Sequence, residues 1–220
     1  MGLRPVNGVL ATVSSWQGSR HRPRYTGDPR PGFMNAGEHL ICSSSLWRHL
    51  TARRLLPWLL SGVELGDHLL EIGAGYGAAT AELQTRASRI TALEYNCSAV
   101  NRLARQFRNR GIGIVRGNAS QLPFPDQTFS SALAILVLHH LRTSELQDQV
   151  FAEAFRVLRS GGIFVCFEIS HHWLHRIAHV GSIYAPVDPA SVFPRLSAAG
   201  YSDVSLDTRR GGFRFKAVRP

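Results

Sequence analysis

Apolar stretches of strand length alternate with stretches of helical periodicity from about residue 68 onward. The strand-like runs cover residues 68–72, 89–94, 112–117, 129–138 and 162–170. Between them, residues 78–87, 98–110 and 143–158 repeat apolar positions at helical spacing, with Ser144 as a possible cap of the third helix. Strands that alternate with helices predict a parallel sheet with helices on both faces.

The two ends of the chain depart from this alternation. Residues 33–60 have a helical pattern, and Ser43 to Ser45 offer a cap within it. Toward the other end, Asp188 is expected to cap a helix that runs to about Ala199. Residues 201–208 and 211–218 then suggest a hairpin around two glycines, and so an antiparallel C-terminal edge strand. We expect an α/β, Rossmann-like, seven-stranded and mostly parallel sheet in one domain over residues 35–220.

Basic residues are numerous, but they do not form one obvious patch. The formal net charge is +10 and nearly all of the basic residues are arginine, since Lys216 is the single lysine. This bias is typical of overall composition, so the charge alone does not predict nucleic-acid binding, which stays open as an alternative. Residues 1–34 are rich in Gly, Pro, Ser and Arg, and predict a flexible basic arm. The simplest interpretation of these residues is a solvent-exposed tail. The alternative is a lid or a partner-binding segment.

The cysteines and the hydropathy exclude other classes. Cys42, Cys97 and Cys166 are scattered, which indicates neither a zinc knuckle nor a disulfide framework and fits a cytoplasmic protein. No apolar run reaches transmembrane length, and we identify no signal peptide at the start of the chain. Nothing in the sequence indicates an oligomeric state.

The stretch "LLEIGAGYGAAT", residues 69–80, predicts a strand that turns tightly into a helix around a ligand. Gly73, Gly75 and Gly77 let the backbone approach that ligand, and the helix amides favour an anionic group. Glu94 ends the next strand, where a carboxylate can accept hydrogen bonds from ribose hydroxyls. Taken alone, this outline serves a dinucleotide as well as S-adenosylmethionine.

Two further features favour S-adenosylmethionine. Glu71 precedes the first glycine, and a carboxylate there suits a ligand with an ammonium and a sulfonium better than it suits a pyrophosphate. Asn118, in "GNASQLPFPDQTFS" after the third strand, has an amide that can meet an adenine edge. The sequence therefore predicts S-adenosylmethionine as the cofactor.

Four blocks in order resemble the class I S-adenosylmethionine-dependent methyltransferases, in the methyltransferase type 11 group and the branch with the ubiquinone and menaquinone C-methyltransferases. These blocks are "LLEIGAGYGAAT", "ALEYN", "GNASQLPFPDQTFS" and "EAFRVLRSGGIFVCFE". The resemblance implies that residues 35–220 form a class I methyltransferase domain. It departs at Ser130 and Ser120, where family members often carry an acid.

The resemblance also implies a set of cofactor-binding residues. Four would hold the methionine moiety: Glu71, Gly73, Ala74 and Gly75. Glu94 would bind the ribose, and Tyr95 would cover the adenine. Asn118 and Ala119 would line the adenine, and Leu136 would lie near the transferring methyl group.

Histidines follow the two strands beside the expected acceptor. His139 or His140 could be a base if the acceptor must lose a proton; each could also be a wall of the pocket. His171, His175 and His179 recur at spacing four and, with Glu168, suggest a metal site. No carboxylate partner or HExxH pattern supports that interpretation, so we predict no metal and interpret the segment, with Trp173, Leu174 and Tyr184, as a cover over the acceptor pocket.

The function predicted from these features is methyl transfer from S-adenosylmethionine to a small-molecule acceptor, such as a quinone-like compound or a secondary metabolite. In-line transfer from an activated donor needs mainly orientation and a dry site. Three alternatives stay open: a methyltransferase that acts on RNA or protein, a non-catalytic cofactor-binding protein and, least favoured, a dinucleotide oxidoreductase. The sequence does not identify the acceptor atom.

Overall fold

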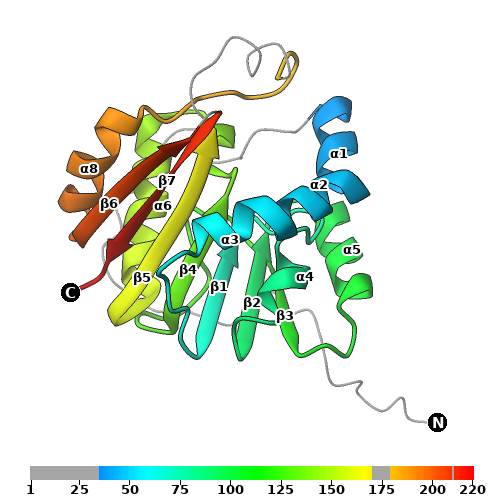
Figure 1. Ribbon diagram of the computed structural model, residues 1–220, viewed down its shortest axis with the longest axis horizontal. Coiled ribbons are helices and arrows are strands. Elements are labelled where there is room, and N and C mark those ends of the chain that lie inside the picture. Colours follow the sequence, from blue (N-terminus) through cyan, green and yellow to red (C-terminus); the bar gives the residue numbers. More distant parts are fainter. Residues whose placement is uncertain (1–34, 170–178, 210) are drawn as a thin grey trace.

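A computed structural model describes residues 35–169, 179–209 and 211–220. The basic arm predicted for residues 1–34 therefore lies outside the described residues. The described chain begins with an almost unbroken helical stretch, seen in blue and cyan in Figure 1. It consists of α1 (Ala36–Ser43), α2 (Ser45–Leu50), a π-helical turn η1 (Thr51–Leu55) and α3 (Leu56–Leu59).

A seven-stranded sheet follows, as the alternation of apolar and helical stretches predicts. Its strands are β1 (His68–Ile72), β2 (Arg89–Glu94), β3 (Ile112–Arg116), β4 (Phe129–Ile135), β5 (Leu158–Ile169), β6 (Ser202–Arg209) and β7 (Gly212–Val218). Their order is β3-β2-β1-β4-β5-β7-β6. The first five strands are parallel, and β7 is antiparallel to both β5 and β6. The antiparallel C-terminal strand thus lies inside the sheet, and β6 forms the edge.

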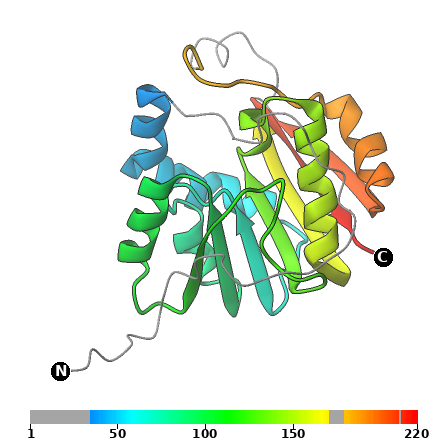
Figure 2. The ribbon, with the colours of Figure 1, turned by 180° about the vertical axis from the view of Figure 1, so that it is seen from behind.

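Helices cover both faces of this sheet (Figures 1 and 2). On one face lie α3, α4 (Thr80–Leu83) and α5 (Cys97–Gln106), and on the other lie α6 (Ser144–Val157) and α8 (Pro189–Ala198). Strand alternation supplies each face with its own core. Leu69, Leu133 and Val165 pack with α3 and α4. Their chain neighbours Leu70, Ala132 and Phe164 pack on the α6 and α8 side.

The helix caps mostly follow the sequence. The Asp188 side chain accepts from the amide of Ala190 at 3.0 Å, which confirms the predicted start of α8. Within the predicted Ser43–Ser45 cap, Ser44 accepts from the amide of Trp47 at 3.0 Å and starts α2. The cap of α6 is Thr143 rather than Ser144, because the Thr143 side chain accepts from the amide of Leu146 at 3.4 Å.

Several elements are shorter than predicted, because the backbone turns left-handed at their ends. Positive φ angles at Gly75 (54°) and Gly77 (79°) delay the helix predicted from residue 78, so α4 begins at Thr80. The helix predicted to residue 110 ends at Gln106, before Asn109 with φ of 63°. The strand predicted to residue 138 ends at Ile135, before Leu136 with φ of 58°. Each boundary is decided by a local dihedral angle that hydrophobic periodicity does not report.

Ser130, one of the two departures from the family pattern, joins β4 to the segment before β1. Its hydroxyl accepts from the amide of His68 at 2.9 Å. It also lies 2.8 Å from the carbonyl oxygen of Leu65 and 3.0 Å from that of His68, to which it can donate. A carboxylate could not donate to these carbonyls, so serine suits this position.

No helix among the described residues is long and apolar enough to cross a membrane.

Candidate functional site

A cavity of about 830 Å³ opens at the carboxyl ends of the parallel strands. This is the edge at which ligands bind in open α/β sheets. The residues that the sequence predicts for cofactor binding and catalysis all line it: Glu71, Gly73, Ala74, Gly75, Glu94, Tyr95, Asn118, Ala119, Leu136, His139 and His140. The fold therefore brings them together, and their individual roles stay predictions.

The glycine loop forms the floor of the cavity. The amides of Gly73 and Ala74 both donate to the carbonyl oxygen of Leu93, at 2.8 and 3.1 Å, so the loop is held against the end of β2. A Cβ on Gly73 would lie 2.5 Å from a methyl group of Val137. A Cβ on Gly75 would meet no described heavy atom within 4 Å. Gly73 is thus needed for packing, whereas Gly75 leaves open space for a ligand.

Glu94 fixes this loop from the neighbouring strand. One carboxylate oxygen accepts from the amide of Gly75 at 2.9 Å, and the other accepts from the amide of Asn96 at 2.7 Å. Each carboxylate oxygen has two lone pairs, so both can still accept from a ligand hydroxyl. The residue predicted only as a ribose ligand is therefore also a structural tie between β2 and the glycine loop.

Glu71 is a buried acid at the back of the cavity. Its side chain accepts a hydrogen bond from the Thr80 hydroxyl at 2.6 Å. Burial, with a smaller contribution from the negative charge of Glu94, raises the pKa of Glu71 to about 8, although the Thr80 hydrogen bond acts in the opposite direction. A cation bound beside Glu71 would stabilise its ionised form.

Asn118 and Ser120 shape the cavity wall beyond β3. The side-chain oxygen of Asn118 accepts from both the amide and the hydroxyl of Ser120, each at 3.0 Å. Ser120 is buried, so an acid at this position would be a buried charge. The serine that departs from the family pattern thus orients the Asn118 amide.

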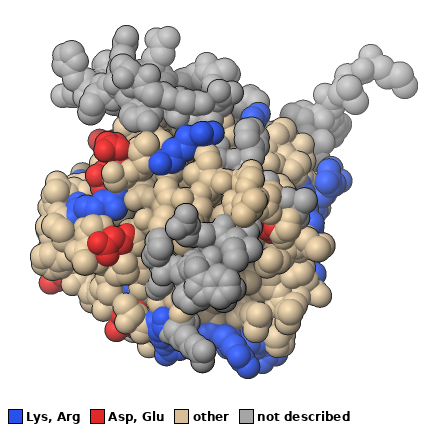
Figure 3. Space-filling model, turned by 90° about the horizontal axis from the view of Figure 1, so that it is seen from above, with Lys and Arg blue, Asp and Glu red and all other residues tan. Residues whose placement is uncertain are grey.

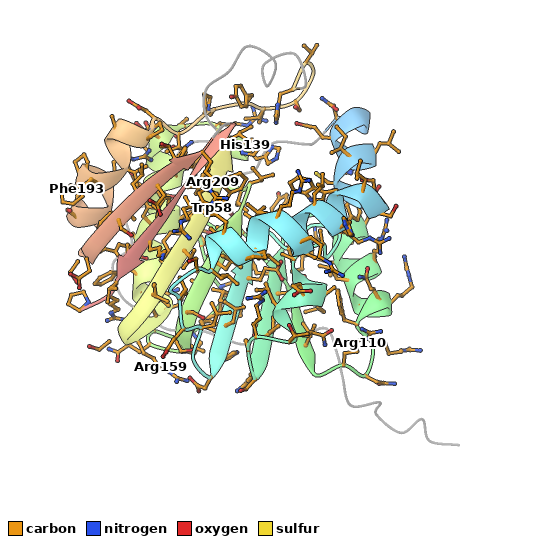
Figure 4. All side chains as sticks on the ribbon, in the orientation of Figure 1. Trp58, Arg110, His139, Arg159, Phe193 and Arg209 are labelled. Carbon is orange, nitrogen blue, oxygen red and sulfur yellow. The ribbon has the colours of Figure 1, made fainter. Side chains whose placement is uncertain are left out.

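A turn at the end of β4 carries Leu136 and the histidine pair. Glu168, at the end of β5, holds this turn by both oxygens of its buried carboxylate. One oxygen accepts from the amides of Val137 and Leu138, at 2.8 and 2.6 Å. The other accepts from Nδ1 of His139 at 2.6 Å. His139 is 3% exposed and lies above the carboxyl ends of the central strands (Figure 4). This contact orients the ring and directs Nε2 away from the carboxylate.

His140 lies in the same short 3-10 helix, η2 (Leu138–His140). Its ring centroid is 4.1 Å from that of His139. Burial, together with the nearby imidazoles of His139 and His179, lowers the pKa of His140 to about 3. This ring is therefore neutral at physiological pH and is a weak base, which leaves His139 as the better-placed proton acceptor of the predicted pair.

The segment from residue 179 onward closes the same end of the cavity. His179 lies in a turn, its Nε2 is 3.0 Å from Oε1 of Glu38 in α1, and Glu38 also accepts from the Ser182 hydroxyl at 2.9 Å. The Tyr184 ring packs against His139 and His179. His171, His175, Trp173 and Leu174 lie outside the described residues, so the predicted helical face of histidines and most of the predicted cover stay predictions.

Sequence reasoning missed Glu168 as the residue that orients His139. The signal was present, because parallel strands β4 and β5 end side by side and Ile135 pairs with Phe167. It also missed Glu38 and Trp47 of the N-terminal helices, both of which line the cavity. Nothing in the spacing of α1 and α2 indicates that they fold back over the glycine loop.

A second, smaller cavity of about 340 Å³ adjoins the first through shared lining residues Trp47, Leu136 and Ile169. Leu50, Leu55 and Phe167 add apolar surface to it. At its rim the guanidinium of Arg209 lies 4.6 Å from the centre of the Trp58 ring (Figure 4). The second cavity thus adds apolar surface beside the larger one.

Known proteins resemble this chain at several levels. Residues 70–166 match the family model described as a methyltransferase domain. A sterol 24-C-methyltransferase from Eremothecium gossypii is 29% identical over 137 residues, which cover 60% of this chain and 34% of that protein. The ubiquinone/menaquinone biosynthesis C-methyltransferase UbiE from Bartonella tribocorum is 29% identical over 169 residues, 72% of this chain and 60% of that protein. The chain thus spans less than two thirds of the length of either relative.

Solved structures agree on the fold. A structure described as a SAM-dependent methyltransferase from Methanosarcina mazei superposes with a TM-score of 0.61 at 20% identity, and the match covers 74% of this chain and 97% of that one. At this identity the likeness concerns the fold alone. The matched family segment runs from β1 through most of β5 and contains the glycine loop, Glu94 and the histidine turn. Residues 70–166 thus match the methyltransferase domain family, and the chain is similar in fold to S-adenosylmethionine-dependent methyltransferases.

Proposed function

We propose that this protein transfers the methyl group of S-adenosylmethionine to a small-molecule acceptor that has an apolar body. The observation that carries the proposal is one cavity with two chemically distinct ends. Glu71, Gly75 and Glu94 line one end, and the histidine turn held by Glu168 lines the other. Such an arrangement suits a donor and an acceptor that must lie in line.

The residues at the first end fit S-adenosylmethionine. Gly75 leaves open space over the loop, and both oxygens of Glu94 retain accepting capacity for ribose hydroxyls. The raised pKa of Glu71 indicates a carboxyl group without a cationic neighbour, and an amino-acid ammonium would supply one. The cofactor, when bound, supplies a methyl group already activated on a sulfonium.

The chain itself has mainly to orient the reactants and exclude water. Positioning of two reactants is worth up to about 7–11 kcal/mol in favourable cases. Leu136, held in a left-handed conformation, lines both cavities. We propose that it contacts the methyl group during transfer, while Asn118 and Tyr95 hold the adenine.

His139 is placed to accept a proton from a molecule bound at the histidine end of the cavity. Glu168 holds its Nδ1–H, so Nε2 is the nitrogen that can take a proton from an acceptor hydroxyl or amine. Glu168 would then stabilise the imidazolium that forms, because it is already in contact with the ring. This role is needed only for an acceptor that loses a proton.

The apolar second cavity favours an acceptor with a hydrophobic portion. Trp47, Leu50 and Phe167 can bury such a portion while the reacting atom stays near His139. The curated relatives support this class, since their names give sterol and quinone biosynthesis as their fields of action. On the coloured part of the face seen in Figure 3, Lys and Arg side chains are scattered rather than gathered. We therefore favour a small molecule over RNA.

The test combines ligand binding with a labelled-methyl transfer assay. S-adenosylhomocysteine should raise the melting temperature of the protein, and NAD should not. With labelled S-adenosylmethionine and cell extract, label should enter the lipid-soluble small-molecule fraction. Label in RNA or protein would show that the acceptor is a macromolecule and not a small molecule. Stabilisation without any methyl transfer would indicate a non-catalytic binding protein. A folded protein that millimolar S-adenosylhomocysteine does not stabilise would refute the proposal.

A further inference from the structure

Three histidines from two distant parts of the chain meet at the acceptor end of the cavity. His139 and His140 come from η2, and His179 comes from the turn after β5. One ring nitrogen from each lies within 4.8 Å of the other two, among the residues that the structure describes. All three line the cavity. Histidine imidazole is the most common protein ligand of transition metals, so a cluster of three is a candidate metal site.

Carboxylates orient two of the three rings. Glu168 holds Nδ1 of His139 at 2.6 Å, and Glu38 lies 3.0 Å from Nε2 of His179. Both carboxylates are buried. Metal-binding histidines usually donate their second ring nitrogen to a carboxylate or a carbonyl, which fixes the ring and strengthens the ligand. The pattern of outer contacts at this cluster is therefore the one that a metal site needs.

The third ring carries a buried nitrogen that has no hydrogen-bond partner among the described residues, Nδ1 of His140. A buried polar atom without a partner costs stability unless a ligand occupies it. The same ring makes a backbone hydrogen bond with Ile183, so it too is anchored.

We propose that His139, His140 and His179 bind one divalent transition-metal ion of the zinc type, with the open coordination position facing the cavity. Three histidines with a fourth, exchangeable position form a known type of catalytic zinc site. Zinc–nitrogen bonds of about 2.0–2.1 Å require ring nitrogens roughly 3.4 Å apart. Nitrogens that now lie as far as 4.8 Å apart must therefore approach by up to about 1.4 Å. Small side-chain rotations of His140 and His179 would supply this.

A metal ion here changes the second end of the site. Nε2 of His139 would become a ligand, and the ion would bind an oxygen atom of the acceptor and favour its ionised form. That consequence rests on the proposed function, whereas metal binding by the cluster does not. The proposal also replaces the prediction of no metal, which considered only His171, His175 and His179 with Glu168 and did not place His139 and His140 beside them.

The test is metal binding by the full chain after dialysis against a chelator. Zn²⁺ titration by calorimetry should show one equivalent bound, and Co²⁺ should give the visible absorption bands of a tetrahedral nitrogen site. His140→Ala and His179→Ala should each weaken Zn²⁺ binding by at least tenfold. The matched control is His49→Ala, which removes an exposed histidine of α2 and should leave binding unchanged.

Thermal stabilisation by S-adenosylhomocysteine serves as the second measurement on every variant. A variant that keeps this response is folded, so loss of Zn²⁺ binding then reports on the cluster alone. Two results would overturn the proposal. One is that the wild type binds Zn²⁺ no more tightly than His140→Ala does. The other is that Zn²⁺ binding survives in His140→Ala and in His179→Ala but is lost in the double variant His171→Ala/His175→Ala. Failure of S-adenosylhomocysteine to bind the metal-free wild type would count against the proposed function and leave the metal result to stand by itself.

Discussion

Glu71→Gln is the substitution whose effect the structure defines most sharply. The change keeps the size of the side chain and its hydrogen bond from Thr80, and removes only the ability to ionise. In the free protein, burial raises the pKa of Glu71 from its ordinary 4.5 to about 8. A raised pKa means that the folded state holds the proton more tightly than the unfolded state does. Glu71 therefore costs the wild type stability as the pH rises from 4.5 to 8, and glutamine does not.

The size of the effect follows from the pKa. One pKa unit corresponds to about 1.4 kcal/mol, so a change from 4.5 to about 8 corresponds to roughly 5 kcal/mol as an upper figure. The unfolding free energy of Glu71→Gln minus that of the wild type should rise by about 2–4 kcal/mol between pH 5 and pH 8.5. Above the pKa the difference should become constant.

The assay is urea unfolding at pH 5, 6, 7, 8 and 8.5, on both proteins without ligand. Glu64→Gln is the matched control, since Glu64 is an exposed acid close in sequence and lies outside the cavity. The control difference should be flat with pH. A flat curve for Glu71→Gln, within about 1 kcal/mol over the whole range, would refute the account of Glu71 as a buried acid that lacks a cation.

The ligand supplies the second half of the same prediction. An ammonium beside Glu71 binds the ionised form, so the wild type must release a proton on binding S-adenosylhomocysteine below pH 8. Affinity should therefore increase with pH up to about 8, and Glu71→Gln should bind at least tenfold more weakly at pH 8.5 with no such increase. Calorimetry in two buffers of different ionisation enthalpy measures the proton release directly.

Three further predictions test other parts of the site and scaffold. Gly75→Ala and Gly111→Ala should each cost about 1–2 kcal/mol in urea unfolding, because both positions have positive φ and open space; only Gly75→Ala should also weaken S-adenosylhomocysteine binding. With an acceptor that loses a proton, Glu168→Gln should lower labelled-methyl transfer about 100-fold and change cofactor affinity less than threefold. A loss of both would indicate collapse of the turn instead. Ser130→Asp should destabilise the protein more than Ser130→Ala, itself about 1–2 kcal/mol, and equal melting temperatures for the two variants would contradict the donor role of the hydroxyl.

Hydrophobic periodicity predicted the sheet well, because buried parallel strands are continuous apolar runs with few other interpretations. The predicted bounds of β1 and β2 match the structure residue by residue. Periodicity failed at the ends of α4, α5 and β4, where Gly77, Asn109 and Leu136 turn the backbone left-handed. The hairpin predicted an antiparallel C-terminal edge strand, whereas β7 lies between β5 and β6 and β6 is the edge.

Some parts of the site were also predictable from the sequence and others were not. Residues that follow parallel strands, such as Glu94 and His139, were predictable because strand ends converge at one edge of the sheet. Contacts made by separate segments were not predictable: the approach of His179 to Glu38 and to His139 depends on where α1 and the turn after β5 lie. Functional residues that belong to one strand and the turn after it can be predicted from the sequence. A cluster formed by residues from three separate segments can be identified only in the folded structure.

The interior position of β7 has a consequence for synthesis of the protein. β6 has only β7 as a sheet neighbour, and β5 needs β7 to complete its second edge, although β7 follows both along the chain. Until residues 212–218 have left the ribosome, β5 and β6 each present unpaired backbone amides and carbonyls to other chains. A nascent chain that stalls in this region would therefore be prone to edge-to-edge aggregation, and a short truncation here would do far more damage than loss of an ordinary edge strand.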